Sequence, residues 1–481
     1  MADNLKEKAV KGVFWSAIQK FSISIISFLS NIVLARLLTP DDYGCIGMLA
    51  IFIVISNALI LGGFVSALIQ RKQVTDIDYS TVFYWNLVIS VLLYIVLFIA
   101  APYIATFYRI ELLSNVLRVL GLTLIINGLS AVQTTIIRRN MQFNKLAKIN
   151  ISSTTLSVVA AISFALLGYG VWSLVIQQIA LGIFNFIFLW SSTIWKPKIE
   201  FSYQSLKEMF SYGSFLMLSE LVNNLCDNIQ GLIIGRKFSP SIMGYYAQAK
   251  KMEEVPTRSI TQLVTQVIFP IYSRLQDDKT KLNHAAKEVL GIMNYVNYPL
   301  MALLLVLAEP LFAIIYGEKW LASVPYFQIL CVAGLVNCMQ SVNYQIVAAT
   351  GRSKKLFYWN FVKRGCGLAF MLFGLIWGVK GLLWGMVAGV YLTYFINAML
   401  AFPATNYSLS QQIIDTMPLL LITSTSTLVE LFFSGFYKSY ISWLFLGSLV
   451  FLLTYIGLSL LFKRREFNEL CKIGKSYLLK K

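Results

Sequence analysis

Charged residues are scarce in this sequence of 481 residues, where Asp, Glu, Lys and Arg together make up only 13%. Hydrophobic residues account for 57% and the mean hydropathy is +0.69, values that a soluble globular chain of this length does not show. The scarcity of charge therefore excludes a soluble globular protein. The composition predicts a polytopic membrane protein.

Histidine is almost absent, since His284 is the only one. It lies among Lys281, Asn283 and Lys287 without a second metal ligand or a triad partner, which favours a solvated side chain over a catalytic one. The sequence also lacks a Gly-rich phosphate loop of the GxxxxGK(S/T) kind, so an ATP site of that class is excluded. We therefore expect neither an enzyme nor a metal site, and no cofactor.

Cysteine is also rare, and its positions argue against a disulfide framework. Five of the six cysteines lie in or beside apolar stretches, and the sixth lies in the basic tail: Cys45, Cys226, Cys331, Cys338, Cys366 and Cys471. Cys331 and Cys338 are seven residues apart on one helix face, which is more typical of packing residues than of ligands.

A cleavable leader is not expected, because residues 1–12 mix acids with lysines and lead into an apolar stretch without a small-residue cleavage site. We expect the amino terminus to stay in the cytoplasm. The formal charge of +18 comes from basic residues in short loops, where insertion orientation and lipid headgroups explain them, so no nucleic-acid partner is expected. The basic and apolar tail, residues 463–481, predicts a cytoplasmic surface anchor.

Fourteen apolar stretches are long enough to cross a hydrocarbon core of about 30 Å as helices. Their approximate limits are 13–37, 45–69, 81–101, 115–137, 149–167, 171–192, 213–235, 252–271, 289–308, 325–348, 361–379, 382–402, 416–433 and 440–462. The predicted fold class is all-α, with fourteen transmembrane helices. Most Lys and Arg then fall on the cytoplasmic side, and the predicted outer loop 236–251 is the exception.

One of these stretches, residues 213–236, is polar along one side. Its polar positions follow the spacing of a single helix face: Glu220, Asn223, Asn224, Asp227, Asn228 and Gly231. An ionised carboxylate inside a membrane costs about 2.5–3.5 kcal/mol, so this face should meet water or a partner helix. Two interpretations stay open: a polar core satisfied between helices, and a substrate or ion path.

An internal repeat divides the chain. Residues 36–44 match residues 236–244 without a gap, and two further matches pair 100–108 with 308–316 and 127–150 with 337–360. Six spans per unit predict two parallel repeats with ligand sites between them. The predicted domains are a six-helix bundle over 1–195, a cytoplasmic interfacial linker helix over 196–212, a second six-helix bundle over 213–402, and two extra spans with the basic tail over 403–481.

The repeated turn has the form Arg-x-x-Thr/Ser-Pro-x-x-x-Gly. Proline ends one helix, Thr or Ser can cap the next, and glycine permits the backbone reversal. The arginine at the helix end is expected to reach the headgroups. This pattern favours a structural role for the turn.

Motifs in the second half resemble the signature of bacterial polysaccharide transporters. They read as GYYAQAKK, a proline inside a helix and FPIYSRLQDD, at Gly244, Tyr245, Tyr246, Pro256, Phe269, Pro270, Ser273, Arg274, Leu275, Gln276, Asp277 and Asp278. The early ARLLTPDDYG, the two six-span halves and the final pair of spans extend the likeness over nearly the whole chain. The chain thus resembles the Wzx-like lipid-linked oligosaccharide flippases of the multidrug/oligosaccharidyl-lipid/polysaccharide superfamily.

This resemblance implies a V-shaped pair of bundles in the bacterial inner membrane that opens alternately inward and outward. The implied substrate is an undecaprenyl-pyrophosphate-linked sugar chain, moved from the cytoplasmic to the periplasmic leaflet for O-antigen, capsule or exopolysaccharide. The implied partners are this lipid-linked oligosaccharide, membrane lipids, and a polysaccharide polymerase with export machinery.

Cations within the predicted spans suit a pyrophosphate headgroup, because weak screening strengthens each charge there. The candidates are Lys20, Arg118 and Arg258. We hypothesise two layers of gate contacts, Lys20 with Glu220 and Arg258 with Asp227, because each pair lies at comparable depth. Static ion pairs that hold the bundle together are the alternative.

Energy for transport would come from a coupling ion, since no ATP site is predicted. Glu220 or Asp227, with Asn224 on the same face, could bind H⁺ or Na⁺ and use the membrane potential, which supplies about 2.3 kcal/mol per charge per 100 mV. A multidrug and toxin extrusion antiporter is the closest rival, although it needs neither the last two spans nor cavity cations. A membrane glycosyltransferase would want paired acids on a large loop, and a scaffold would not need the two-bundle repeat.

Overall fold

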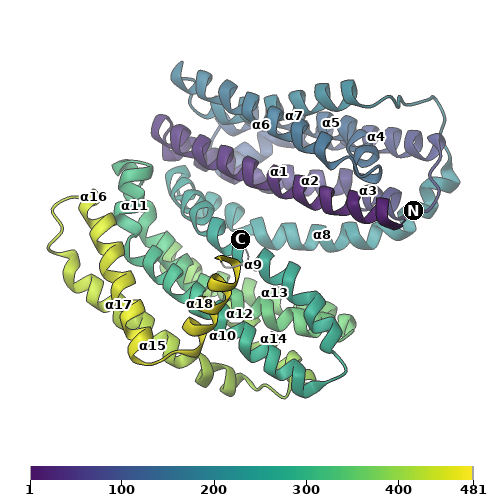
Figure 1. Ribbon diagram of the computed structural model, residues 1–481. Helices are drawn as coiled ribbons and strands as arrows, with labels where there is room; N and C mark the ends of the chain where they lie inside the picture. Colours follow the sequence, from purple (N-terminus) through teal and green to yellow (C-terminus); the bar gives the residue numbers. More distant parts are fainter. Residues whose placement is uncertain (1, 479–481) are drawn as a thin grey trace. The chain divides into compact units, whose positions relative to one another are not determined.

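The computed structural model describes the backbone of residues 2–478 and the side chains of residues 11–470 and 472, except those at positions 212, 216, 263, 264, 266, 267 and 353. Within this part of the chain, the secondary structure is helical and no strand is present (Figure 1). The predicted all-α class is confirmed. The chain divides into two compact units, Met1–Gly244 and Tyr245–Lys481.

The first unit is built from eight helices. They are α1 (Ala2–Leu37), α2 (Pro40–Leu61), α3 (Phe64–Gln70), α4 (Asp76–Tyr108), α5 (Leu112–Arg139), α6 (Phe143–Leu166), α7 (Val171–Ser192) and α8 (Tyr203–Lys237). Helix α4 packs along α5, α6 packs along α7 and α1, and α8 packs along α2 (Figure 1). Helix α9 (Pro240–Leu275) begins in this unit and continues into the second.

The second unit continues with longer and shorter helical segments. They are α10 (Lys279–Val306), α11 (Ala308–Ile315), η1 (Glu318–Ser323), α12 (Val324–Ala349), α13 (Ser353–Gly374), η2 (Leu375–Trp377), α14 (Gly378–Thr405), α15 (Leu409–Ser434), α16 (Tyr440–Ser442), η3 (Trp443–Gly447), α17 (Ser448–Leu461) and α18 (Arg465–Leu478). Helix α14 packs on both α12 and α13, and α10 packs on α12 and α15. A buried apolar core joins α10, α12, α14 and α15.

Eleven helical runs in the described chain are long and apolar enough to cross a membrane. One of them, Lys354–Thr405, has 52 residues and contains both α13 and α14. Helices α8 and α9 are not among the eleven, because charged and amide residues interrupt their apolar stretches. The chain is therefore a multi-pass membrane protein whose two most polar long helices are consecutive.

The prediction that residues 236–251 form a loop is wrong, whereas their place on the outer side stays a prediction. Helix α8 ends at Lys237 and α9 begins at Pro240, so that Lys250 and Lys251 lie within a helix. The physical reason is local: the Ser239 hydroxyl accepts a hydrogen bond from the Ile242 amide at 3.4 Å, and proline suits the first turn of a helix. Helix α9 therefore starts before its apolar stretch does.

The linker also differs from the separate helix predicted over 196–212. Residues 193–202 form no helix, and α8 then runs unbroken from Tyr203 through the predicted boundary at 212. The non-helical part is tied to the start of α4, since the Lys198 amide donates to Ser80 Oγ at 3.1 Å and the Ser202 amide donates to Thr81 Oγ1 at 3.0 Å. The segment is thus held by hydrogen bonds to the first unit.

Candidate functional site

The polar face predicted on residues 213–236 is present on α8. Glu220, Asn223 and Asp227 are exposed, and Asn224 is half-buried. The Asn228 side chain donates from Nδ2 to the backbone carbonyl of Asn224 at 2.9 Å, within the same helix. Helix α8 packs on α2, and Gly231, which belongs to the same predicted face, approaches Gly47. The Glu220 and Asp227 side chains thus stay exposed, although the same face of α8 approaches α2 at Gly231.

The inner predicted layer involves Lys20 and Glu220. Lys20 lies on α1 and Glu220 on α8, in the first unit, and both side chains are exposed. Exposure makes both side chains accessible to lipid headgroups, water or a ligand. Their role as a gate contact stays a prediction.

The outer predicted layer involves Arg258 and Asp227. Arg258 Nη2 lies 2.9 Å from Glu254 Oε2, one turn earlier on α9, and the Arg258 side chain is mostly exposed. Asp227 belongs to the first unit and Arg258 to the second, so their pairing stays a prediction. An exposed ion pair within one helix contributes little stability, which leaves the Arg258 guanidinium available to exchange Glu254 for another anion.

Arg118, the third predicted cation, is held by one neighbour. Its guanidinium carbon lies 4.5 Å from the centre of the Phe98 ring, and its Nε donates to the Phe98 carbonyl oxygen at 3.4 Å. Phe98 is an exposed aromatic on α4. This arrangement is typical of a cation that caps an aromatic surface, and it gives Arg118 the weakest geometric link to a ligand among the three cations.

Four buried ionic side chains among the described residues were missed from the sequence: Asp78 on α4, Glu253 on α9, Lys363 on α13 and Glu430 on α15. Glu253 accepts a hydrogen bond from Thr257, and Glu430 Oε1 accepts one from Trp443 Nε1 at 2.8 Å. Each lies within a few residues of a predicted span end, where a charge was assigned to the water side. These side chains could have been predicted as buried from their pattern, an acid or base within two turns of a span boundary and next to aromatic or amide residues.

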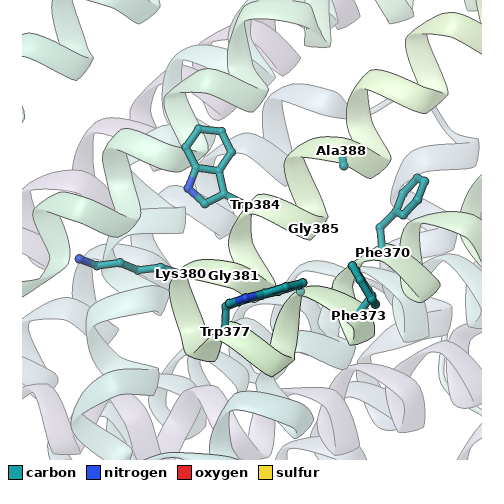
Figure 2. A pocket seen from close by; sticks show the side chains of 9 residues that line it. Phe370, Phe373, Trp377, Lys380, Gly381, Trp384, Gly385 and Ala388 are labelled. Atoms are coloured by element: carbon teal, nitrogen blue, oxygen red, sulfur yellow. The ribbon is translucent and has the colours of Figure 1, made fainter.

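A cavity of about 420 Å³ lies at the junction of α13, η2 and α14. Figure 2 shows Phe370, Phe373, Trp377 and Trp384 around it, with the Lys380 side chain extending away from the rings. Its walls are aromatic, which suits lipid chains better than a polar ligand.

A second cavity, of about 430 Å³, has charged walls from α10, α15 and the segment around Arg464. Lys287 Nζ lies 3.7 Å from Asp415 Oδ2, and Arg464 Nη2 lies 2.9 Å from Glu466 Oε1. His284 is exposed at its edge, 3.7 Å from Glu288. Within the described residues, no group of three or more His, Cys, Asp and Glu side chains is placed to hold a metal ion.

Sequence comparisons give consistent relatives. A family profile described as "Polysaccharide biosynthesis protein" matches residues 33–325. The chain is similar to the teichuronic acid biosynthesis protein TuaB of Bacillus subtilis (strain 168), with 28% identity over 74% of each chain. It is also similar to the lipopolysaccharide biosynthesis protein WzxC of Escherichia coli (strain K12), with 25% identity over 83% of this chain and 81% of the relative.

Solved structures with the same fold are transporters. The lipid II flippase MurJ in an inward closed conformation aligns with a TM-score of 0.76 over 94% of this chain and 99% of that one, at 15% identity. An inward-facing multidrug resistance MATE family transporter of the MOP superfamily aligns with a TM-score of 0.61 over 86% of this chain and 99% of that one, also at 15% identity. At this identity the likeness establishes the fold.

Proposed function

This chain belongs to the family of polysaccharide biosynthesis proteins, and from that premise we propose that it flips undecaprenyl-pyrophosphate-linked oligosaccharide from the cytoplasmic to the periplasmic leaflet. The product feeds O-antigen, capsule or exopolysaccharide export. The similarity to WzxC and TuaB over most of the chain supports this substrate class. The likeness of its fold to that of MurJ supports a transporter architecture.

The observation that carries the proposal is the polarity of α8. A helix of 35 residues in a multi-pass protein keeps Glu220, Asn223 and Asp227 exposed along one face. Because charged groups in a membrane are costly, such a face needs a hydrated path or a polar ligand. Lys20 and Arg258 supply the cations for the pyrophosphate, and Arg118 contributes less because Phe98 holds it.

Transport works by alternating access and is coupled to H⁺ or Na⁺. Glu220 and Asp227 are the coupling groups, and Asn224 lies beside them on the same helix. A carboxylate that binds a cation on one side of the membrane and releases it on the other converts the membrane potential into directed motion. No chemical step on the substrate is required, so the protein acts as a transporter and not as an enzyme.

The proposed topology has fourteen spans in the bacterial inner membrane, with both termini in the cytoplasm. The first six spans are α1, α2 together with α3, α4, α5, α6 and α7. The next six are α8, α9, α10, α12, α13 and α14. The last two are α15, and α16 together with α17. The two sets of six are the parallel repeats. A polysaccharide polymerase and the export machinery would receive the product on the outer side.

The deciding experiment places purified protein in vesicles with fluorescent undecaprenyl-pyrophosphate oligosaccharide in the inner leaflet. Outward movement of the lipid that depends on an H⁺ or Na⁺ gradient supports the proposal, and Glu220→Gln with Asp227→Asn should remove that dependence. Lipid that stays in its original leaflet at every gradient would refute it. In cells, depletion should trap the lipid-linked oligosaccharide on the cytoplasmic face.

The second candidate is a multidrug antiporter, favoured by the likeness of the fold to the MATE family transporter. This alternative predicts efflux of cationic dyes driven by an ion gradient, with normal pools of lipid-linked oligosaccharide. The family membership and the two spans after α14 favour the flippase.

A further inference from the structure

Lys363 is a buried cation near the middle of α13. Only 6% of the residue is exposed. Its Nζ donates to Asn397 Oδ1 of α14 at 2.9 Å and lies 5.8 Å from the centre of the Tyr344 ring of α12. Three helices therefore meet around one ammonium group.

No carboxylate in the described part of the chain pairs with Lys363. An ammonium has three donors, and Asn397 accepts only one of them. The Asn397 amide is also committed elsewhere, because its Nδ2 donates to the Gln340 carbonyl oxygen at 3.2 Å. A buried charge without a counter-ion costs several kcal/mol, so such a group is retained where it has an anion to meet.

Helix α12 carries a polar stripe beside Lys363, formed by Asn337, Gln340, Ser341 and Tyr344 at the spacing of one helix face. Gln340 Nε2 donates to Asn337 Oδ1 at 2.8 Å. Asn337, Gln340 and Ser341 are half-buried, and Tyr344 is 36% exposed. The stripe thus reaches from the surface of the unit to the buried ammonium.

Burial distinguishes Lys363 from a lysine exposed at a membrane surface. Lys363 lies about 15 Å from either end of α13 at 1.5 Å per residue, further than a lysine side chain extends. A lysine that snorkels keeps its ammonium in water, whereas the Lys363 ammonium is buried against Asn397 and Tyr344. An anion that meets this ammonium would therefore lie among α12, α13 and α14.

We infer that Lys363 and the α12 polar stripe form an oxyanion site that receives the charged group of the substrate in transit. This inference rests on the proposed function and adds a site to it. The ligand chemistry is a phosphate or carboxylate oxygen, from the pyrophosphate of the carrier lipid or from an acidic sugar. The Nζ donors bind the oxyanion, and the stripe amides and hydroxyls bind neighbouring sugar or phosphate oxygens.

Binding to the purified full chain in detergent tests the site, with undecaprenyl pyrophosphate, inorganic pyrophosphate and glucuronate as separate probes. We expect Lys363→Met to weaken binding by about tenfold or more, the equivalent of a charge-assisted hydrogen bond. Lys363→Arg keeps the positive charge and should retain most of the wild-type binding affinity. The matched control is Lys380→Gln, which removes an exposed cation from α14, and it should bind as wild type does.

The outcomes separate the two proposals. If Lys363→Met loses binding of the two pyrophosphate probes, the site binds the pyrophosphate of the carrier lipid. If Lys363→Met loses binding of glucuronate alone, the site binds an acidic sugar. Binding of inorganic pyrophosphate that depends on Lys363, together with no binding of undecaprenyl pyrophosphate, would support the oxyanion site and refute the proposed function. Equal binding of every probe by wild type and Lys363→Met, or no binding of any probe by wild type, overturns the inference.

If the Lys363 variants do not yield folded protein, the binding test uses substitutions on α12 instead. Ser341→Val and Gln340→Leu remove stripe groups without touching the buried charge, and each should weaken the probe bound by wild type. Unchanged affinity in both would overturn the inference. Thermal melting of every variant separates loss of binding from loss of fold.

Discussion

Gly44 and Pro240 are in backbone contact, although they are almost two hundred positions apart in the sequence. A Cβ added to Gly44 would lie 1.9 Å from the Pro240 carbonyl oxygen. The repeat-related contact is reciprocal, because a Cβ on Gly244 would lie 1.9 Å from the Pro40 carbonyl oxygen. Ser241 Oγ also donates to Asp41 Oδ1 at 2.7 Å. The starts of α2 and α9 therefore pack as a symmetric pair.

The first prediction concerns this crossing. Gly44→Val and Gly244→Val should each lower the melting temperature of the purified protein, because overpacking costs about 1–3 kcal/mol when backbone must move. Each should also slow flipping. The double variant should cost less than the sum of the two, since the first substitution already separates the turns.

Gly435→Ala is the control for the crossing, because Gly435 has no neighbour within 4 Å of an added Cβ and its φ of −67° suits any residue. It should melt as wild type does. Strict additivity of the two valine variants would contradict the shared contact.

The second prediction concerns Arg71 and Asp78. Asp78 is 4% exposed, its Oδ1 lies 3.4 Å from Arg71 Nη1, and Ser205 of α8 donates to it. Arg71→Leu should cost about 2 kcal/mol of stability, less than the 3–5 kcal/mol of a fully buried pair, because one third of the Arg71 side chain is exposed. Ser205→Ala should cost less, since the cation stays. Thermal unfolding in detergent measures both.

Lys198→Gln is the matched control for that pair. Lys198 Nζ contacts Asp76 at 2.9 Å, but both side chains are more than half exposed. Exposed pairs contribute little, so the melting temperature should stay unchanged. A decrease in melting temperature as large as that of Arg71→Leu would show that exposure does not determine how much these two ion pairs contribute to stability.

The third prediction concerns Glu430 and Trp443. Glu430 is fully buried, the indole Nε1 donates to its Oε1 at 2.8 Å, and Oε2 has no partner among the described residues. Trp443→Phe leaves the carboxyl without this donor and should cost about 1–3 kcal/mol. Adding Glu430→Met should recover part of the loss, because the unpaired group is removed. Trp377→Phe, at an exposed indole, is the control, and an equal loss there would contradict the assignment.

Sequence reasoning found the features that depend on local pattern. The polar side of α8 follows from the spacing of Glu220 and Asp227, and the turn before α2 follows from Thr39 and Pro40. Thr39 indeed caps α2, with its side chain accepting from the Asp42 amide. Local spacing fixes which residues share a helix face, and it needs no knowledge of the neighbouring helices.

Features that depend on distant partners were not predictable. Lys363 looked like a residue at the cytoplasmic edge of a span, and its burial comes from Asn397 and Tyr344 on other helices. The early start of α9 is different, because it is local: the repeated turn already indicated a cap at Ser239 before Pro240, but the span limits followed hydropathy, which marks only the lipid-facing part of a helix.

The last prediction ranks the three cations of the proposed pathway by exposure, since Lys20 and Arg258 are exposed and Arg118 is half-buried. Arg118 is engaged by the ring and carbonyl of Phe98, whereas Arg258 is largely exposed with only Glu254 at 2.9 Å, and Lys20 is exposed on α1. Arg118→Gln should therefore change the flipping rate in vesicles by less than about twofold, because its contacts are those of a surface cation. Lys20→Glu and Arg258→Glu should abolish flipping, since they place a negative charge where the pyrophosphate must pass. Normal flipping by Lys20→Glu would remove Lys20 from the pathway, and a loss with Arg118→Gln as complete as with Arg258→Glu would reverse the ranking.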